Sequence, residues 1–180
     1  DTLLDIARQR VYVDPSPLAQ DLCGRFRPGH FRGVATIVLK LLNLIAPNIL
    51  VLGKKDLQQL TIVREMLEQL NLPVELLGAQ TIRDADGLAL SSRNQYLSAA
   101  ERAEAPHLYR CLRAVAAAPD RKRAAEAALL ELQSAGWKVD YIAVRDARTL
   151  AEPAIGAPLV VLGAAWLGAT RLIDNVEIFE

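Results

Sequence analysis

The segment ILVLGKKDLQQL, residues 49–60, joins a short apolar run to a glycine and to the start of an amphipathic pattern. It predicts a strand, a tight loop and a helix in succession. In an open α/β sheet, ligands bind beyond the carboxyl ends of the strands, where a helix start offers unpaired N–H groups to an anion. At this place Lys55 could meet a phosphate, Asp56 could cap the helix or accept from a sugar hydroxyl, and Gly53 lets a ligand approach the backbone. An ordinary loop with two solvated lysines explains the residues equally well, because no complete P-loop or GxGxxG pattern is present.

The periodicity on both sides of this segment predicts a parallel sheet. One amphipathic helix is expected from Val34 until Pro47, with its buried stripe at Ile37, Val38, Leu41, Leu42 and Ile45. Residues 49–52 do not alternate, as expected of a parallel strand covered on both faces. A second helical stripe, with Met66 as core filling, crosses residues 60–70, and another strand begins at residue 73. Helix, strand, helix and strand in this order are typical of a βαβ arrangement.

The preceding residues are less regular. Residues 11–13 are a strand candidate, and a turn at 14–17 leads into a short helix. Residues 25–33 contain three arginines and His30 in a stretch made irregular by proline and glycine. Such a stretch can surround an anion, although we favour a surface loop that enters a helix.

The pattern changes at residues 81–94, and we place a domain boundary there, between residues 1–81 and residues 82–180. Ser91, Ser92 and Arg93 could bind a polyphosphate on a mobile loop, since arginine offers a planar fork of donors. A polar loop that caps a helix fits these three residues equally well. Ser98 and Glu101 then match a capping box.

The remaining residues predict a small α+β domain. Pro106 should kink or restart a helix, and an alanine-rich helix at 121–134 ends at Gly136. Strands are expected at 139–144, 159–162 and 172–178, with Asp174 near the exposed side of the last one. His107 has no partner pattern nearby and is interpreted as structural.

Composition excludes several classes of function. The 180 residues carry 21 basic and 21 acidic side chains, so no overall field favours nucleic acid or an acidic membrane surface. Two cysteines without CxxC spacing indicate neither a disulfide framework nor a zinc site, and a reducing cytoplasm fits them. No apolar run approaches the roughly 20 residues that span a bilayer.

Several long motifs occur together and in order: RPGHFRG at 27–33, GKKDLQQ at 53–59, DGLALSSRN at 86–94, AWLG at 165–168 and RLIDN at 171–175. With these motifs the chain resembles the C-terminal two-thirds of the pantothenate synthetase (pantoate–β-alanine ligase) family. The resemblance implies the C-terminal part of a nucleotidyltransferase-type Rossmann sheet followed by a small α+β lid domain. It also implies a reaction in which ATP and pantoate form pantoyl adenylate and pyrophosphate, after which β-alanine releases AMP.

The resemblance implies roles for single residues as well. Lys55 would contact the ATP phosphates, Gly53 and Asp56 the ribose, and Gln59 the pantoate. Ser91, Ser92 and Arg93 would bind the triphosphate with its Mg²⁺, and Ile82 belongs to the same ATP-binding set. Arg27 and His30 would be neighbours of the site. No protein residue is expected to bind a metal directly, and the full-length parent is expected to be a cytoplasmic homodimer without nucleic-acid or membrane partners.

One departure from the family is clear, because the His-x-Gly-His motif of its ATP site is absent and the chain contains only His30 and His107. We therefore expect residues 1–180 alone to lack pantothenate synthesis. A non-catalytic module that binds a nucleotide or a partner at the same crevice is the main alternative. A relative of the tRNA-charging adenylases is disfavoured, because no basic face is evident.

Overall fold

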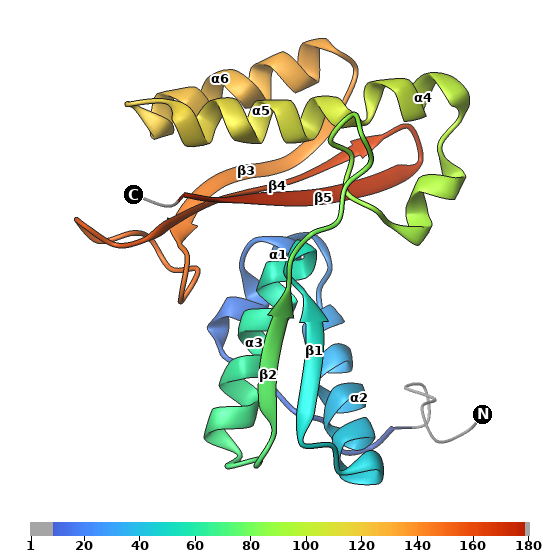
Figure 1. Cartoon of the computed structure of the whole chain (residues 1–180), viewed down its shortest axis with the longest axis vertical. Helices are drawn as coiled ribbons and strands as arrows, with labels where there is room; N and C mark the ends of the chain where they lie inside the picture. The colour runs from blue at the N-terminus through green and yellow to red at the C-terminus, as the bar shows by residue number, and fades with distance from the viewer. Residues whose placement is uncertain (1–8, 179–180) are drawn as a thin grey trace. The chain divides into compact units, whose positions relative to one another are not determined.

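The computed structural model describes residues 9–178 and has the α/β composition expected from the sequence (Figure 1). The chain divides into two compact units, residues Asp1–Ala79 and Gln80–Glu180, called unit 1 and unit 2 below. None of the helices in residues 9–178 combines the length and the apolar character needed to cross a lipid bilayer.

Unit 1 is a parallel strand–helix–strand arrangement with a further long helix. Its elements are η2 (Pro17–Gln20), α1 (Cys23–Phe26), α2 (His30–Ile45), β1 (Ile49–Gly53), η3 (Lys54–Asp56), α3 (Leu57–Gln69) and β2 (Glu75–Ala79). Strands β1 and β2 pair in parallel from Ile49 opposite Glu75 to Gly53 opposite Ala79, which confirms the predicted βαβ arrangement. Met66 lies in the core between the helices and the sheet, as expected.

The prediction that β1 is covered on both faces is wrong for this chain. Leu50 and Leu52 pack against the core formed by α2 and α3, whereas Ile49 and Val51 are 51% and 57% exposed. Successive strand residues point to opposite faces, and residues of both helices pack on the face of Leu50 and Leu52. An apolar strand face therefore remains exposed within unit 1.

Two further expectations for unit 1 fail. Residues 11–13 form no strand, and the Val13 N–H donates to Thr36 Oγ1 at 3.0 Å instead of to a neighbouring strand. Helix α2 begins at His30, ahead of the predicted start, and its buried residues are Phe31, Ala35, Thr36 and Leu42. Ile45, expected in the buried stripe, is 67% exposed in the last turn.

A buried glutamine connects the short N-terminal helices of unit 1 to α3. Gln58 Nε2 donates to the carbonyls of Leu18 at 2.8 Å and Asp21 at 2.9 Å, and its Oε1 accepts from the Cys23 N–H at 3.0 Å. The two carbonyls also accept from the N–H groups of Asp21 and Gly24, so Gln58 provides each of them with a second donor and gives the Cys23 N–H an acceptor. Gln58 fixes the η2–α1 segment that leads into α2.

Unit 2 is an antiparallel sheet covered by helices on one face (Figure 1). Its elements are η4 (Ser92–Tyr96), α4 (Ala99–Glu104), α5 (Pro106–Ala117), α6 (Arg121–Ser134), β3 (Lys138–Asp146), β4 (Leu159–Leu167) and β5 (Thr170–Ile178), with strand order β3-β4-β5. The capping box of Ser98 and Glu101 is confirmed, and Pro106 starts α5 as expected. Helix α5 lies so close to β4 that a Cβ on Gly163 would come within 2.9 Å of Leu112.

The expectation that Asp174 lies near an exposed side is wrong. Asp174 is 6% exposed, because strand alternation puts it on the same face as Leu172 and Val176, which pack in the core with α5. Arg83 makes this burial tolerable: its Nη1 and Nη2 donate to the two oxygens of Asp174 at 2.6 and 2.9 Å. A buried carboxylate needs such paired donors.

A second buried ion pair crosses the sheet. The pairing of β3 with β4 shifts in register between Val139 and Tyr141, which leaves Asp140 as an extra residue. Asp140 Oδ2 accepts from Arg171 Nε at 2.7 Å, and both side chains are almost fully buried. The irregularity in β3 therefore coincides with the position of a buried charge.

Candidate functional site

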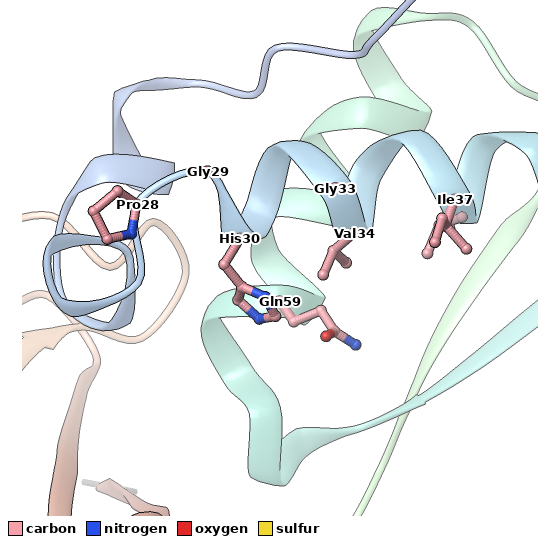
Figure 2. Close-up of a pocket in the computed structure, with 8 residues that line it drawn as sticks. Pro28, Gly29, His30, Gly33, Val34, Ile37 and Gln59 are labelled. Atoms are coloured by element: carbon pink, nitrogen blue, oxygen red, sulfur yellow. The ribbon is translucent and has the colours of Figure 1, made fainter. Parts of the chain in front are cut away.

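Unit 1 contains a pocket of about 580 Å³ between the first half of α2 and the start of α3. Figure 2 shows His30, Val34 and Ile37 along one side of α2 and Gln59 extending from α3. The lining residues are Pro28, Gly29, His30, Gly33, Val34, Ile37, Val38 and Gln59. Aliphatic side chains thus face an imidazole and an amide, which is the usual composition of a small-molecule site.

The imidazole in this pocket has a defined hydrogen-bond partner. Arg27 Nη1 lies 2.8 Å from His30 Nε2, and a guanidinium can only donate. Nε2 therefore accepts in this bond, and a neutral His30 carries its proton on Nδ1. Gly29, which precedes the helix in a left-handed conformation with φ of 77°, provides no side-chain cap to the first turn of α2.

The other two arginines of this segment do not contribute to the same place. Arg25 pairs with Asp21 at 3.4 Å, whereas Arg32 pairs with Asp14 at 2.9 Å and lies 4.3 Å from the centre of the Tyr12 ring. Their charges are satisfied by acidic side chains of unit 1. The segment enters α2 as we favoured, although it starts in the last turn of α1 and only residues 27–29 form a turn, and Arg27 is bonded to a pocket residue.

The residues predicted around the end of β1 occupy the expected turn. Gly53 ends β1, Lys55 and Asp56 form η3, and Gln59 follows one turn into α3. Asp56 takes the N-cap position of α3, but its side chain makes no capping hydrogen bond, so the predicted capping role is wrong. The structure brings Gln59 and His30 to the same pocket, whereas Gly53, Lys55 and Asp56 are not among its lining residues.

The remaining predicted residues belong to unit 2. The Ile82 side chain is exposed, and its carbonyl accepts from the Leu90 N–H at 2.9 Å. Ser91 caps η4 by accepting from the Arg93 N–H at 3.2 Å, and the side chains of Ser92 and Arg93 are exposed. The capping interpretation of this loop therefore holds for Ser91, while two polar side chains face solvent.

The loop before these residues is fixed by contacts that the sequence did not reveal. Arg83 donates to the Gly87 carbonyl at 3.1 Å as well as to Asp174, and its guanidinium lies 3.6 Å from the centre of the Tyr109 ring. Arg102 pairs with Asp86 at 2.5 Å. That bond, followed by the Leu88 N–H, lowers the pKa of the Asp86 carboxyl.

Asn94 adds a further contact at the end of the same loop. Its Nδ2 donates to the Ala89 carbonyl at 3.1 Å, and within the described residues its buried Oδ1 has no hydrogen-bond partner. Arg83 therefore attaches the start of segment 83–94 to β5, and the bond from Asn94 to Ala89 closes a turn within the segment. No local sequence pattern identified Arg83, because its partner Asp174 lies 91 residues away.

These features define an α/β protein in which a parallel strand–helix–strand unit with a small-molecule pocket precedes an antiparallel, helix-covered sheet. A sequence model of the family described as Pantoate-beta-alanine ligase matches residues 3–177. The chain therefore belongs to the pantoate-beta-alanine ligase family.

Individual relatives agree with this assignment. The Pantothenate synthetase of Thiobacillus denitrificans is 58% identical over 177 residues, covering 94% of this chain and 62% of that protein. The Pantothenate synthetase of Neisseria meningitidis serogroup B is 53% identical over 176 residues, covering 94% of this chain and 63% of that protein. The chain thus spans less than two-thirds of the length of these relatives.

Solved structures share the fold. The Pantothenate synthetase of Thermus thermophilus superimposes with a TM-score of 0.87 at 40% identity, over 98% of this chain and 66% of that one. The Pantoate-beta-alanine ligase of Francisella tularensis, complexed with Beta-gamma ATP and Beta-alanine, gives a TM-score of 0.75 at 31% identity, over 93% and 58% of the two chains.

Proposed function

We propose that the whole protein joins pantoate to β-alanine at the expense of ATP. The observation that carries this proposal is the 58% identity over 177 residues to a Pantothenate synthetase. The Francisella tularensis relative, which holds Beta-gamma ATP and Beta-alanine, supports two of the three substrates. The fold is then the C-terminal part of a nucleotidyltransferase-type Rossmann sheet, residues 1–81, followed by a lid domain, residues 82–180.

The chemistry consists of two displacements. A carboxylate oxygen of pantoate attacks the α-phosphorus of ATP, and the bond to pyrophosphate breaks. The amine of β-alanine then attacks the acyl carbon, loses a proton and expels AMP. No protein nucleophile is needed, so catalysis rests on positioning two anions and on fixed positive groups around the developing charge.

The pocket of unit 1 suits the pantoate part of this reaction. Val34, Ile37 and Val38 offer an apolar wall to a branched carbon skeleton, and the Gln59 amide can bond to a hydroxyl or carboxylate. Arg27 and His30 add polar groups at the start of α2. We assign Gln59 to pantoate and regard Arg27 and His30 as neighbours of the site.

Residues of each unit are assigned to the nucleotide. Lys55 contacts the phosphates, Gly53 and Asp56 the ribose, and Ile82 belongs to the same nucleotide-binding set. The polar side chains of Ser91, Ser92 and Arg93 bind the triphosphate, which arrives with Mg²⁺ as part of the substrate. Two of these three side chains are exposed and available to a ligand.

We further propose that the whole protein is a cytoplasmic homodimer without nucleic-acid or membrane partners. The cytoplasm suits the two buried free cysteines.

Two adjacent lysines provide the test. In the whole protein Lys55→Ala should slow pantoyl-adenylate formation on the order of 10²-fold, since a positive charge at the transferred phosphates is lost. Lys54→Ala is the matched control, because the Lys54 stem lies along Gly78 of β2 and no role in ATP binding is assigned to it. A single-turnover assay with ATP and pantoate measures both variants.

Equal rates in the two variants and the wild type would contradict the role of Lys55. If the wild-type protein binds ATP but forms no pantoyl adenylate, the proposed reaction is wrong and the non-catalytic binding module takes its place.

A further inference from the structure

Three side chains with metal-binding chemistry meet on helices α5 and α6 of unit 2. His107 and Cys111 are four residues apart on α5 and therefore share one face of that helix. Glu131 faces them from α6, and the ligand atoms of the three residues all lie within 4.8 Å of one another. Imidazole nitrogen, sulfur and carboxylate oxygen are the three donor types that zinc accepts.

The imidazole is oriented from behind by a carboxylate. Glu104 Oε1 lies 2.7 Å from His107 Nδ1 and also accepts from Trp137 Nε1 at 3.0 Å. A carboxylate can only accept, so Nδ1 carries a proton that it donates to Glu104, and Nε2 donates to Glu131 until a metal ion replaces its proton. This arrangement is the one that orients histidine ligands in metal sites, where the second ring nitrogen donates to a carboxylate.

The ligand atoms must shift to accept an ion, because they lie within 4.8 Å of one another and not at the spacing of a bound ion. His107 Nε2 and Glu131 Oε1 are 2.7 Å apart, and two ligands of a tetrahedral zinc ion are separated by roughly 3.3 Å. The Glu131 side chain is 61% exposed and can move by this amount, whereas Cys111 belongs to the buried face of α5 and is packed in the core of unit 2. An ion can therefore enter from the solvent side of Glu131 and reach the sulfur.

We propose that His107, Cys111 and Glu131 form a site for a zinc-like divalent transition-metal ion, with Glu104 and Trp137 positioning the histidine. Sulfur and imidazole donors select such an ion over Mg²⁺ and Ca²⁺, which prefer oxygen ligands. Three protein ligands leave the fourth tetrahedral position to water. The cysteine spacing gave no sign of this site, because its ligands come from two helices.

Binding replaces protons at two ligand atoms. The Cys111 thiol loses its proton to solvent as the metal–sulfur bond forms, and His107 releases a proton from Nε2 when it starts as the imidazolium that bridges Glu104 and Glu131. The charges of the bound ion then balance those of the Cys111 thiolate and the Glu131 carboxylate. Because binding releases these protons, we expect it to weaken as the pH falls.

The test is a titration of the whole, nucleotide-free protein with Co²⁺, a spectroscopic substitute for zinc. We expect one equivalent to produce a thiolate-to-cobalt charge-transfer band, which Zn²⁺ then removes. Cys111→Ser should abolish the band. Cys23→Ser is the matched control, because Cys23 is also a buried free cysteine but lies in unit 1, and it should retain the band.

Two milder variants keep the proposal testable if Cys111→Ser does not fold. His107→Gln should remove the saturable band. Glu104→Gln should weaken Co²⁺ binding about 10- to 100-fold, because the carboxylate that orients the His107 ring is lost. Absence of the band in the wild-type protein would overturn the proposal, and so would a band that survives in both Cys111→Ser and His107→Gln. All readouts are spectroscopic, so the result is independent of the ligase reaction.

Discussion

The two sheets differ in how completely this chain covers them. In unit 1 the five-residue strands β1 and β2 leave Ile49, Val51 and Leu77 exposed. In unit 2 the nine-residue strand β4 is buried at every position except Leu159 and Trp166, which are half-buried. Parallel strands normally have both faces covered, so the exposed apolar face of unit 1 is unusual for its sequence pattern. An apolar run in a parallel strand thus predicts that both faces of the strand need to be covered. It does not predict which residues cover them, because those residues lie elsewhere in the sequence.

The largest expected effect contrasts a core leucine with one on the exposed face. Leu112, a fully buried residue of α5, packs against β4, and Leu112→Ala should reduce the free energy of unfolding by about 2–5 kcal/mol. Leu77→Ala on β2 should cost about 0.5 kcal/mol or less, since Leu77 is 42% exposed. Urea denaturation followed by circular dichroism measures both. A loss for Leu77→Ala as large as that for Leu112→Ala would mean that the face is covered in solution.

The next effect tests how unit 1 fixes its short helices. Gln58→Ala removes the acceptor of the Cys23 N–H and one of the two donors to each of the Leu18 and Asp21 carbonyls, and a buried group left unsatisfied costs about 1–3 kcal/mol. We expect a total loss of about 2–3 kcal/mol, because water can reach part of the vacated space. The neighbouring Gln59→Ala, in the pocket, should leave the free energy of unfolding nearly unchanged. Equal effects in the two variants would show that the backbone contacts of Gln58 are not important.

A smaller effect concerns the loop of unit 2. Arg83→Lys keeps the positive charge but loses the bidentate hydrogen bonding to Asp174. We therefore expect the free energy of unfolding to fall by about 1–2 kcal/mol. Limited proteolysis should also cut segment 83–94 faster than in the wild type. Arg93→Lys, at an exposed position of the same loop, is the control and should change neither measurement. Unchanged proteolysis in Arg83→Lys would indicate that the other contacts fix the loop.

The smallest effect is a pH dependence in unit 2. The Ser98 N–H, followed by the Ser98 hydroxyl, lowers the pKa of Glu101 below its usual 4.5. A lowered folded-state pKa contributes stability that is present above pH about 4.5 and is lost as the pH falls through the folded value. Glu101→Gln preserves the capping pattern and removes this titration, so its free energy of unfolding should fall less steeply on acidification.

Much of the fold could be predicted because its signals are local. The βαβ arrangement followed from apolar spacing around residues 49–60, and the capping box and the restart at Pro106 followed from residues adjacent in sequence. The missed features depend on distant residues: Thr36 accepts the Val13 N–H 23 residues away, and Arg83 reaches Asp174. The exposed face of β1 was missed for the same reason, because the residue pattern of a strand does not show which other elements pack on its faces.

The candidate site divides in the same way. The position of Lys55 and Asp56 at the strand end could be predicted from the glycine and the change of period, and the structure places both in η3. The pocket could not, because Ile37 and Val38 have the spacing of core residues and their exposure to a pocket depends on how α2 meets α3. A side chain that lines an apolar pocket and one that fills a core have the same pattern in sequence.

The buried pair of Asp140 and Arg171 has a consequence for how the sheet of unit 2 forms during folding. If β3 paired with β4 one residue out of place, alternate side chains would exchange faces and Asp140 would no longer meet Arg171. A buried charge without its partner costs about 3–5 kcal/mol, enough to make that pairing short-lived. The ion pair therefore adds to the apolar residues of β3 in selecting one alignment of the strands.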